Sequence, residues 1–177
     1  MPTCLPGQGG TRKRMWLSRE QPSGLRVDPP LTEGFLFSDS DIPRETIQAY
    51  LETEYFVFDD ASTTLKVGQA NPKLAALHNT HDVTCSAFIT ACNPFSQNCS
   101  AGFNAARQQE LARELKLLGL VVIDGIGKHP SNNWPGEASF LVLGLTLETA
   151  KALGTRYGQN AIVWSTDDAT PQLVLLR

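Results

Sequence analysis

Four polar residues near the middle of the chain, Asn93, Ser96, Asn104 and Arg107, have types and a spacing that could bind an anion. Asn93 directly follows the apolar run Cys85–Cys92, and Asn104 and Arg107 open the helical pattern that comes next. A strand end that faces a helix start presents free backbone N–H groups and the positive end of the helix dipole. The Arg107 guanidinium would add a forked donor for a carboxylate or a phosphate. The alternative is that the asparagines cap the loop and the helix while Arg107 pairs with a carboxylate such as Glu137.

A second group of candidates lies in the loop predicted over Gly125–Glu137, which is long for a connection between adjacent strands. Long ordered loops often carry function. Trp134 could stack on a planar ligand, and Glu137 with His129 would supply a general acid and base if both faced one cleft. The alternative interpretation is a loop fixed by a buried Trp134, with Glu137 as its internal hydrogen-bond acceptor.

Two amides, Gln159 and Asn160, follow Gly158 between a helical pattern and the next strand. They could read the edge of a base or a sugar, but side chains at this place more often satisfy a helix C-terminus, and we favour that role. The chain has no P-loop and no G-x-S-x-G motif. Gly125-Ile126-Gly127 lacks the third glycine and the following helix of a dinucleotide fingerprint. We therefore predict no cofactor.

A metal site is the weaker option. His78-x-x-His81-x-x-x-Cys85 offers ligands that zinc accepts, but the pattern crosses a helix end, a loop and a strand start. Cys85 and Cys92 would lie on opposite faces of one straight strand, so they cannot share a metal there. Cys92 could be a nucleophile beside the helix dipole, although a thiol in the core is the more usual case. We predict no metal.

Composition narrows the class of protein. The chain has 177 residues and a net charge of −3, so it carries no overall basic field and we do not expect it to bind nucleic acid. No stretch approaches the roughly 20 apolar residues that span a bilayer, and the first residues lack the apolar segment of a secretory signal. We expect a cytoplasmic protein without membrane contact, in which the four cysteines are reduced thiols.

The chain divides into two parts by composition. Residues 1–45 are rich in Pro, Gly, Ser and Arg and lack a regular hydrophobic period, which predicts a poorly ordered tail. Translation from Met15 is an alternative to a start at Met1. Residues 46–177 are predicted to form a single α+β domain, with the helical pattern that opens it beginning just before, near Glu45.

The order of predicted elements indicates the fold. A hairpin, Tyr55–Phe58 with Thr64–Val67, precedes a short helix, and from Cys85 the order is β-α-β-β-α-β-β. The first six of these elements match the ferredoxin-like split β-α-β arrangement. We predict a two-layer α+β sandwich, with the hairpin and a last strand extending the sheet and two helices covering one face. The elements after the hairpin are predicted at Lys73–His78, Cys85–Cys92, Phe103–Leu118, Leu120–Ile126, Ser139–Leu145, Leu147–Tyr157, Ala161–Ser165 and Leu173–Leu176.

Several separated motifs form a set that can be compared with known families. They are Phe88–Pro94, Asn104, Arg107, Gly125 with Pro130, Trp134–Val142 and Tyr157–Val163. Together they resemble a family of small bacterial proteins known as a domain of unknown function, number thirty-two ninety-three. The resemblance covers roughly residues 46–177 and departs from the family at Ala138, where the family usually has Pro between Glu and Ser. It implies a shared fold and transfers no activity.

These observations favour a module that binds or senses a small anionic or nucleotide-like molecule. One alternative is a small hydrolase or transferase that uses Glu137 or His129 as acid and base. Another is an accessory factor that binds a second protein. We also consider a homo-oligomer, since pairing between copies is one way to cover sheet edges. The predicted ligand-binding residues are Asn93, Asn104, Arg107, Trp134, Glu137 and Gln159.

Overall fold

The computed structural model of the protein describes residues 40–60 and 62–177. The predicted tail, residues 1–45, falls almost entirely outside them and stays a prediction. The described helices are α1 (Arg44–Glu52), α2 (Pro72–Thr80), α3 (Ala101–Leu117) and α4 (Leu147–Arg156), with one 3-10 turn, η2 (Pro94–Ser96). The strands are β1 (Glu54–Val57), β2 (Thr63–Leu65), β3 (Ser86–Ile89), β4 (Val121–Lys128), β5 (Glu137–Leu143), β6 (Ala161–Ser165) and β7 (Gln172–Leu175).

All seven strands form one curled sheet with the order β2-β1-β4-β5-β3-β6-β7, and every neighbouring pair is antiparallel. The predicted α+β class and the N-terminal hairpin of β1 and β2 are confirmed. The central strand β3 has four consecutive buried residues, as its apolar sequence predicts. It ends at Ile89, so the predicted strand through Cys92 was too long.

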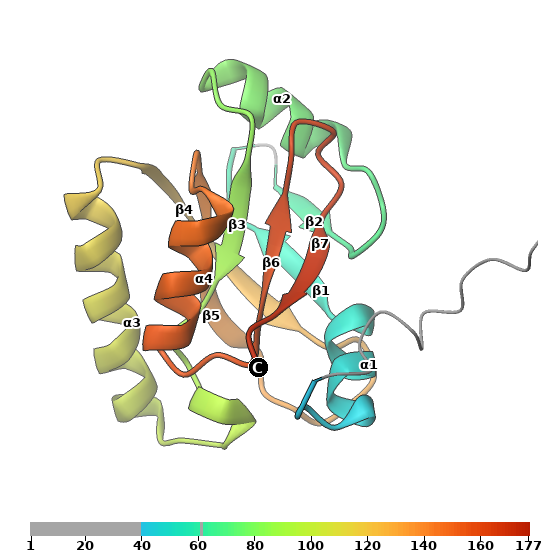
Figure 1. The fold of residues 1–177 in the computed structure, drawn as a ribbon, viewed down its shortest axis with the longest axis vertical. Coiled ribbons are helices and arrows are strands. Elements are labelled where there is room, and N and C mark those ends of the chain that lie inside the picture. Colours follow the sequence, from blue (N-terminus) through green and yellow to red (C-terminus); the bar gives the residue numbers. More distant parts are fainter. Residues whose placement is uncertain (1–39, 61) are drawn as a thin grey trace, which may run out of the picture. The chain divides into compact units, whose positions relative to one another are not determined.

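The two faces of the sheet carry separate hydrophobic cores. On one face, Ala87 and Ile89 of β3 pack with Leu111 and Leu115 of α3 and with residues of α4. Figure 1 shows α3 and α4 side by side on that face, as predicted for these two helices. On the other face, Phe88 joins a second core that includes residues of β1, β5, β6 and α2. Because alternate residues of a strand point to opposite faces, β3 contributes to both cores.

Local signals set the helix ends. Asn71 caps α2 by accepting from the backbone N–H groups of Lys73 and Leu74, and Ser100 and Thr146 cap α3 and α4 in the same way. Gly158 follows α4 with a φ of +68°, a conformation that glycine adopts without strain. Helix α3 ends at Leu117, one residue before its predicted end at Leu118.

The boundaries of the predicted loop were wrong. Gly125, Gly127 and Lys128 belong to β4, and Glu137 is the first residue of β5, so only residues 129–136 connect the two strands. Glu137 pairs with Gly127, which in turn pairs with Tyr55 of β1. The three residues therefore form one row across the sheet. Because Gly127 has no side chain, this row leaves room between the side chains of Tyr55 and Glu137.

The two glycines of β4 differ in how much space surrounds them. A Cβ atom on Gly125 would lie 2.5 Å from the Phe56 carbonyl oxygen and 2.8 Å from the Phe88 ring. A Cβ on Gly127 would meet its nearest atom, in the Tyr55 ring, at 3.6 Å, an ordinary contact distance. Overpacking of a core commonly costs about 1–3 kcal/mol, whereas alanine in place of an unstrained glycine is favourable by about 0.5–1 kcal/mol.

We expect Gly125→Ala to lower the free energy of unfolding by about 1–3 kcal/mol. We expect Gly127→Ala to leave it unchanged or slightly raised, since that methyl group fits the space beside Tyr55. Urea denaturation of the two variants and the wild type measures the difference. Equal destabilisation of both variants would contradict the difference in packing.

Candidate functional site

A cavity of about 340 Å³ lies between α1 and the face of the sheet opposite α3 and α4. This volume is within the range of about 300–1,000 Å³ that small-molecule pockets occupy. The sheet contributes Tyr55, Phe88, Gly127, Glu137, Ser139 and Val163 to its lining. The helix contributes Glu45, Thr46, Ala49 and Tyr50.

The side chain of Asn93 organises the polar end of the cavity. Its Oδ1 accepts from Asn104 Nδ2 at 2.8 Å and from the backbone N–H of Cys99 at 3.0 Å. Its Nδ2 donates to Glu137 Oε1 at 2.7 Å, and its backbone N–H donates to Asn104 Oδ1 at 2.9 Å. The asparagines therefore do stabilise the loop, as the alternative interpretation proposed. Asn93 also fixes the position of Glu137.

Glu137 uses only half of its carboxylate in these contacts. Trp134 Nε1 donates to the same oxygen, Oε1, at 2.9 Å. Among the described residues, no donor reaches Oε2. Burial raises the pKa of Glu137 above its ordinary value, and the hydrogen bonds from Asn93 and Trp134 offset part of that rise. The residue thus combines a fixed orientation with one acceptor oxygen that the protein leaves unused.

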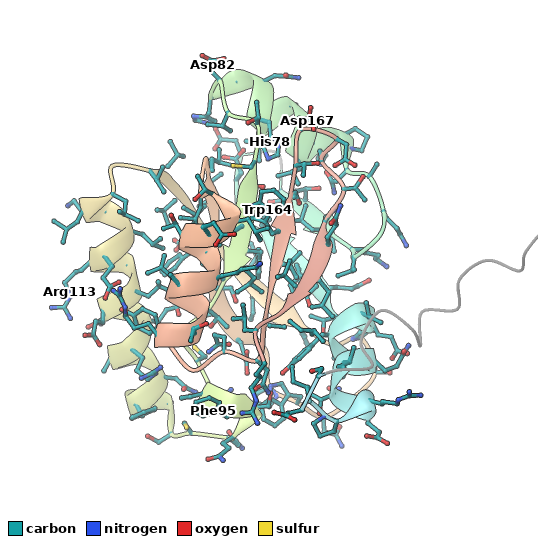
Figure 2. All side chains as sticks on the ribbon, in the orientation of Figure 1. His78, Asp82, Phe95, Arg113, Trp164 and Asp167 are labelled. Carbon is teal, nitrogen blue, oxygen red and sulfur yellow. The ribbon has the colours of Figure 1, made fainter. Side chains whose placement is uncertain are left out.

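The turn after Asn93 has a strained backbone. Asn93, Phe95 and Ser96 have φ values of 46°, 55° and 57°, in the left-handed region. Asparagine tolerates this region, but a bulky residue such as phenylalanine does so rarely, and such residues cost about 1–3 kcal/mol each. A hydrogen bond from the Phe95 N–H to the Gly158 carbonyl, at 2.7 Å, holds the turn in place. Figure 2 shows Phe95 at the lower end of the sheet, the same end as α1. Strain of this kind is concentrated at functional sites.

The strained turn places Ser96 against α1. Tyr50 Oη of the helix lies 2.5 Å from Ser96 Oγ, and Asn160 Nδ2 donates to both hydroxyl oxygens. Tyr55 Oη donates to the backbone carbonyl of Tyr50. Sequence reasoning considered Ser96 but missed Tyr50, although both line the cavity. Only a signal that linked residues 46 positions apart could have found this contact.

The structure separates the six predicted ligand residues into two sets. Asn93, Trp134, Glu137 and Gln159 line the cavity, whereas Asn104 supports Asn93 from behind. Gln159 Nε2 also donates to the Cys92 carbonyl at 2.9 Å. Trp134 is 38% exposed, so the predicted burial of this residue is wrong, but Glu137 does accept a hydrogen bond from within the loop, as the alternative interpretation expected.

Arg107 does not line the cavity. Its Nε donates to the Ala91 carbonyl at 3.0 Å and its Nη2 donates to the Tyr157 carbonyl. The guanidinium lies over the rings of Phe103 and Tyr157, at 5.5 and 5.4 Å from the ring centroids. It therefore ties the end of β3 to the end of α4, and it makes no contact with Glu137.

His129 lies outside the cavity as well. Its Nε2 is 3.1 Å from Glu52 Oε2, and its Nδ1 accepts from the backbone N–H groups of Ser131 and Asn132. A ring nitrogen that accepts in this way carries no proton, so Nε2 is the protonated one. The histidine organises the loop between β4 and β5 and does not face Glu137 across the cavity.

The residues considered for zinc do not converge. His78 is buried with its Nε2 at 2.9 Å from Ser86 Oγ, while His81 is exposed at the end of α2. Figure 2 shows His78 beside the start of β3. Within residues 40–60 and 62–177, no group of three or more His, Cys, Asp or Glu side chains could hold a metal ion. In the same part of the chain, no helix is long and apolar enough to cross a membrane.

The comparison with protein families places these residues in a known group of sequences. Residues 89–162 match the family described as "Protein of unknown function (DUF3293)". The match begins at the end of β3 and ends in β6, so it includes all six predicted ligand residues. DUF3293 is the family that the motifs resemble, and the resemblance is thereby confirmed over this range. No curated protein and no solved structure matches the chain significantly. The family description names no activity, so the chemistry of the site must be argued from its own geometry.

We expect Arg107→Ala to lower the free energy of unfolding by about 2–3 kcal/mol, because hydrogen bonds from charged groups contribute about 1.5–3 kcal/mol. Arg107→Lys should recover little of this loss, since one ammonium cannot reproduce the forked contact with two carbonyls. Urea denaturation gives both values. Arg113, exposed on the same helix, provides the matched control as Arg113→Ala.

We expect Glu137 to make stability depend on pH. Its pKa in the folded state is raised above the ordinary value of 4.5, so the folded state binds this proton more tightly than the unfolded chain. The free energy of unfolding therefore falls as pH rises from the unfolded pKa through the raised folded pKa. Glu137→Gln, which cannot ionise, should remove that fall.

The measurement is urea denaturation of the wild type and Glu137→Gln at a series of pH values, taken as the difference between the two curves. Glu110→Gln, on the exposed face of α3, controls for loss of one negative charge. A constant difference between wild type and Glu137→Gln across the range would show that Glu137 keeps an ordinary pKa.

Proposed function

We propose that this protein is a small-molecule binding or sensing module whose ligand occupies the cavity beneath α1. The observation that supports this most strongly is the state of Glu137. Two donors fix its carboxylate at the wall of the cavity, yet Oε2 has no donor among the described residues. An oriented polar group without a protein partner, in a cavity with both polar and apolar lining residues, is typical of ligand sites.

The attachment of α1 supports the same proposal. The helix contributes several lining residues but fully buries only Ile47. It makes polar contacts from Tyr50 to Ser96 and from Glu52 to His129. Polar contacts at a surface are individually weak, so they can open and close without loss of the core. We propose that a ligand enters when α1 moves away from the sheet.

We further propose a ferredoxin-like core for the segment from β3 to β6. Its elements follow in the order β3-α3-β4-β5-α4-β6, and the four strands lie in the order β4-β5-β3-β6. Each of the connections through α3 and α4 passes over one intervening strand, which is the split arrangement. The hairpin of β1 and β2 and the strand β7 extend this core on its two edges. The cavity then lies on the face that α3 and α4 leave uncovered.

The two alternatives have less support. An enzyme that pairs Glu137 with His129 would need both groups in one cleft, and His129 instead holds the loop and Glu52. A protein-binding role, alone or as a homo-oligomer through the edge strands β2 and β7, has no specific contact in its favour. A cytoplasmic location remains part of the proposal.

The test uses a substitution that fills the cavity. Ala49 lines the cavity from α1, whereas Gln48 on the same helix is exposed. We expect the purified wild type to retain, or to bind from a fragment library, a molecule on the order of a few hundred daltons. Ala49→Phe should lose it and Gln48→Phe should keep it. Native mass spectrometry and ligand-observed NMR report the binding, and circular dichroism confirms that both variants fold. A wild type that binds nothing, or an Ala49→Phe variant that binds as well as wild type, would refute the cavity as the site.

A further inference from the structure

The charged residues that line the cavity, within the part of the chain that the structure describes, all have one sign. Glu137 lines it from the sheet and Glu45 lines it from α1. No Lys, Arg or His of the described residues belongs to the lining. Arg107, the cation that the sequence predicted for this site, donates instead to the Ala91 and Tyr157 carbonyls. A bound anion would therefore meet two carboxylates and no compensating charge, which disfavours it.

The geometry at Glu137 selects for a hydrogen-bond donor. Asn93 and Trp134 already donate to Oε1, so the carboxylate cannot turn without breaking two hydrogen bonds. Its Oε2 offers lone pairs only and has no donor among the described residues. An N–H group of a ligand would satisfy this oxygen, and a cationic N–H group would also compensate the buried charge.

The rest of the lining selects for a flat, partly apolar body. Tyr55 and Phe88 pack edge to face, with ring centroids 5.3 Å apart, and form one wall. Val163 and Leu173 add aliphatic surface beside them. Trp134, held by its bond to Glu137, is 38% exposed, so part of its indole remains available to a ligand. Aromatic side chains next to a carboxylate are the surroundings in which proteins bind organic cations.

We propose that the cavity binds a small planar molecule with a cationic N–H donor, an amidinium or a protonated amine, that donates to Glu137 Oε2. This ligand class rests on the proposed function, since it specifies the occupant of the same cavity. It replaces the anionic ligand expected from the sequence. That expectation depended on Arg107 and on the start of α3, and neither lines this cavity.

Three probes of one shape and different charge test the proposal. Benzamidine carries a cationic amidinium, benzamide is neutral and benzoate is an anion, and all three share the same planar ring. We expect the wild type to bind benzamidine at least about tenfold more tightly than benzoate, with benzamide between them. Ligand-observed NMR titrations measure weak dissociation constants of this kind. Equal affinity for the three probes, or a preference for benzoate, would overturn the assigned ligand class.

Glu137→Gln sharpens the test because it keeps the shape of the side chain. The Gln oxygen can still accept from Asn93 and Trp134, while its NH₂ group replaces Oε2. We expect this variant to bind benzamidine about tenfold or more weakly than the wild type does. Its affinity for benzamide should be unchanged, since the contacts with the ring remain. Glu110→Gln, which removes one exposed carboxylate elsewhere, should bind all three probes as the wild type does.

The outcomes separate this inference from the proposed function. If Ala49→Phe abolishes binding of all three probes while the wild type shows no charge preference, the cavity is the site and the cationic class is wrong. If the wild type binds none of the probes, both the ligand class and the cavity as a site for ligands of this size are refuted. The comparison of probes on the wild type needs no variant, so it decides the ligand class even if Glu137→Gln does not fold.

Discussion

The side-chain amide of Asn93 joins three parts of the chain, and the polar end of the cavity depends on it. It connects the end of β3, the start of α3 through Asn104, and the start of β5 through Glu137. Its Nδ2 donates to Glu137 and its Oδ1 accepts two hydrogen bonds, and such bonds reduce the desolvation penalty of a buried amide. Because Asn93 also has a left-handed backbone, the chain turns sharply there and carries Ser96 back toward α1. One residue therefore fixes both the acid of the site and the hydroxyl opposite it.

The cavity exists because of specific features of the sequence and not because of loose packing. On one face of the sheet, Ala87, Ile89, Leu111 and Leu115 are fully buried against α3 and α4. On the other face, Gly127 lies in the row between Tyr55 and Glu137 and adds no side chain. A helix bridges the resulting space by polar contacts at its ends. The strained turn at Phe95 and Ser96 is tolerated because the well-packed core supplies the stability that a strained segment needs.

Local signals were enough to predict most of the fold. Asn71 before Pro72 marks the start of α2, and the strand Ala161–Ser165 is found at its predicted bounds. The same signals misled where tertiary contacts decide the outcome. Gly125 and Gly127 are typical of a loop, but they lie in β4, where the Phe56 carbonyl and the Phe88 ring occupy the space that a side chain on Gly125 would need. Within the site, the polar residues at the ends of strands and helices were predicted, because functional residues are concentrated there. Tyr50 was not, because an aromatic residue in a helical pattern is usually a core residue.

The sign of the charge in the site could not be predicted from the residues near it. A helix start and an arginine beside a strand end favour an anion only when their donors are free. Here Ser100 caps α3, and the Arg107 guanidinium donates to the backbone carbonyls of Ala91 and Tyr157. Glu137 Oε2 has no donor among the described residues, so this acceptor is open to a partner in the cavity. The ligand class that the site can bind therefore depends on which atom of the hydrogen-bond network has no partner, here Glu137 Oε2. It does not depend on Arg107, the charged residue from which the sequence analysis started.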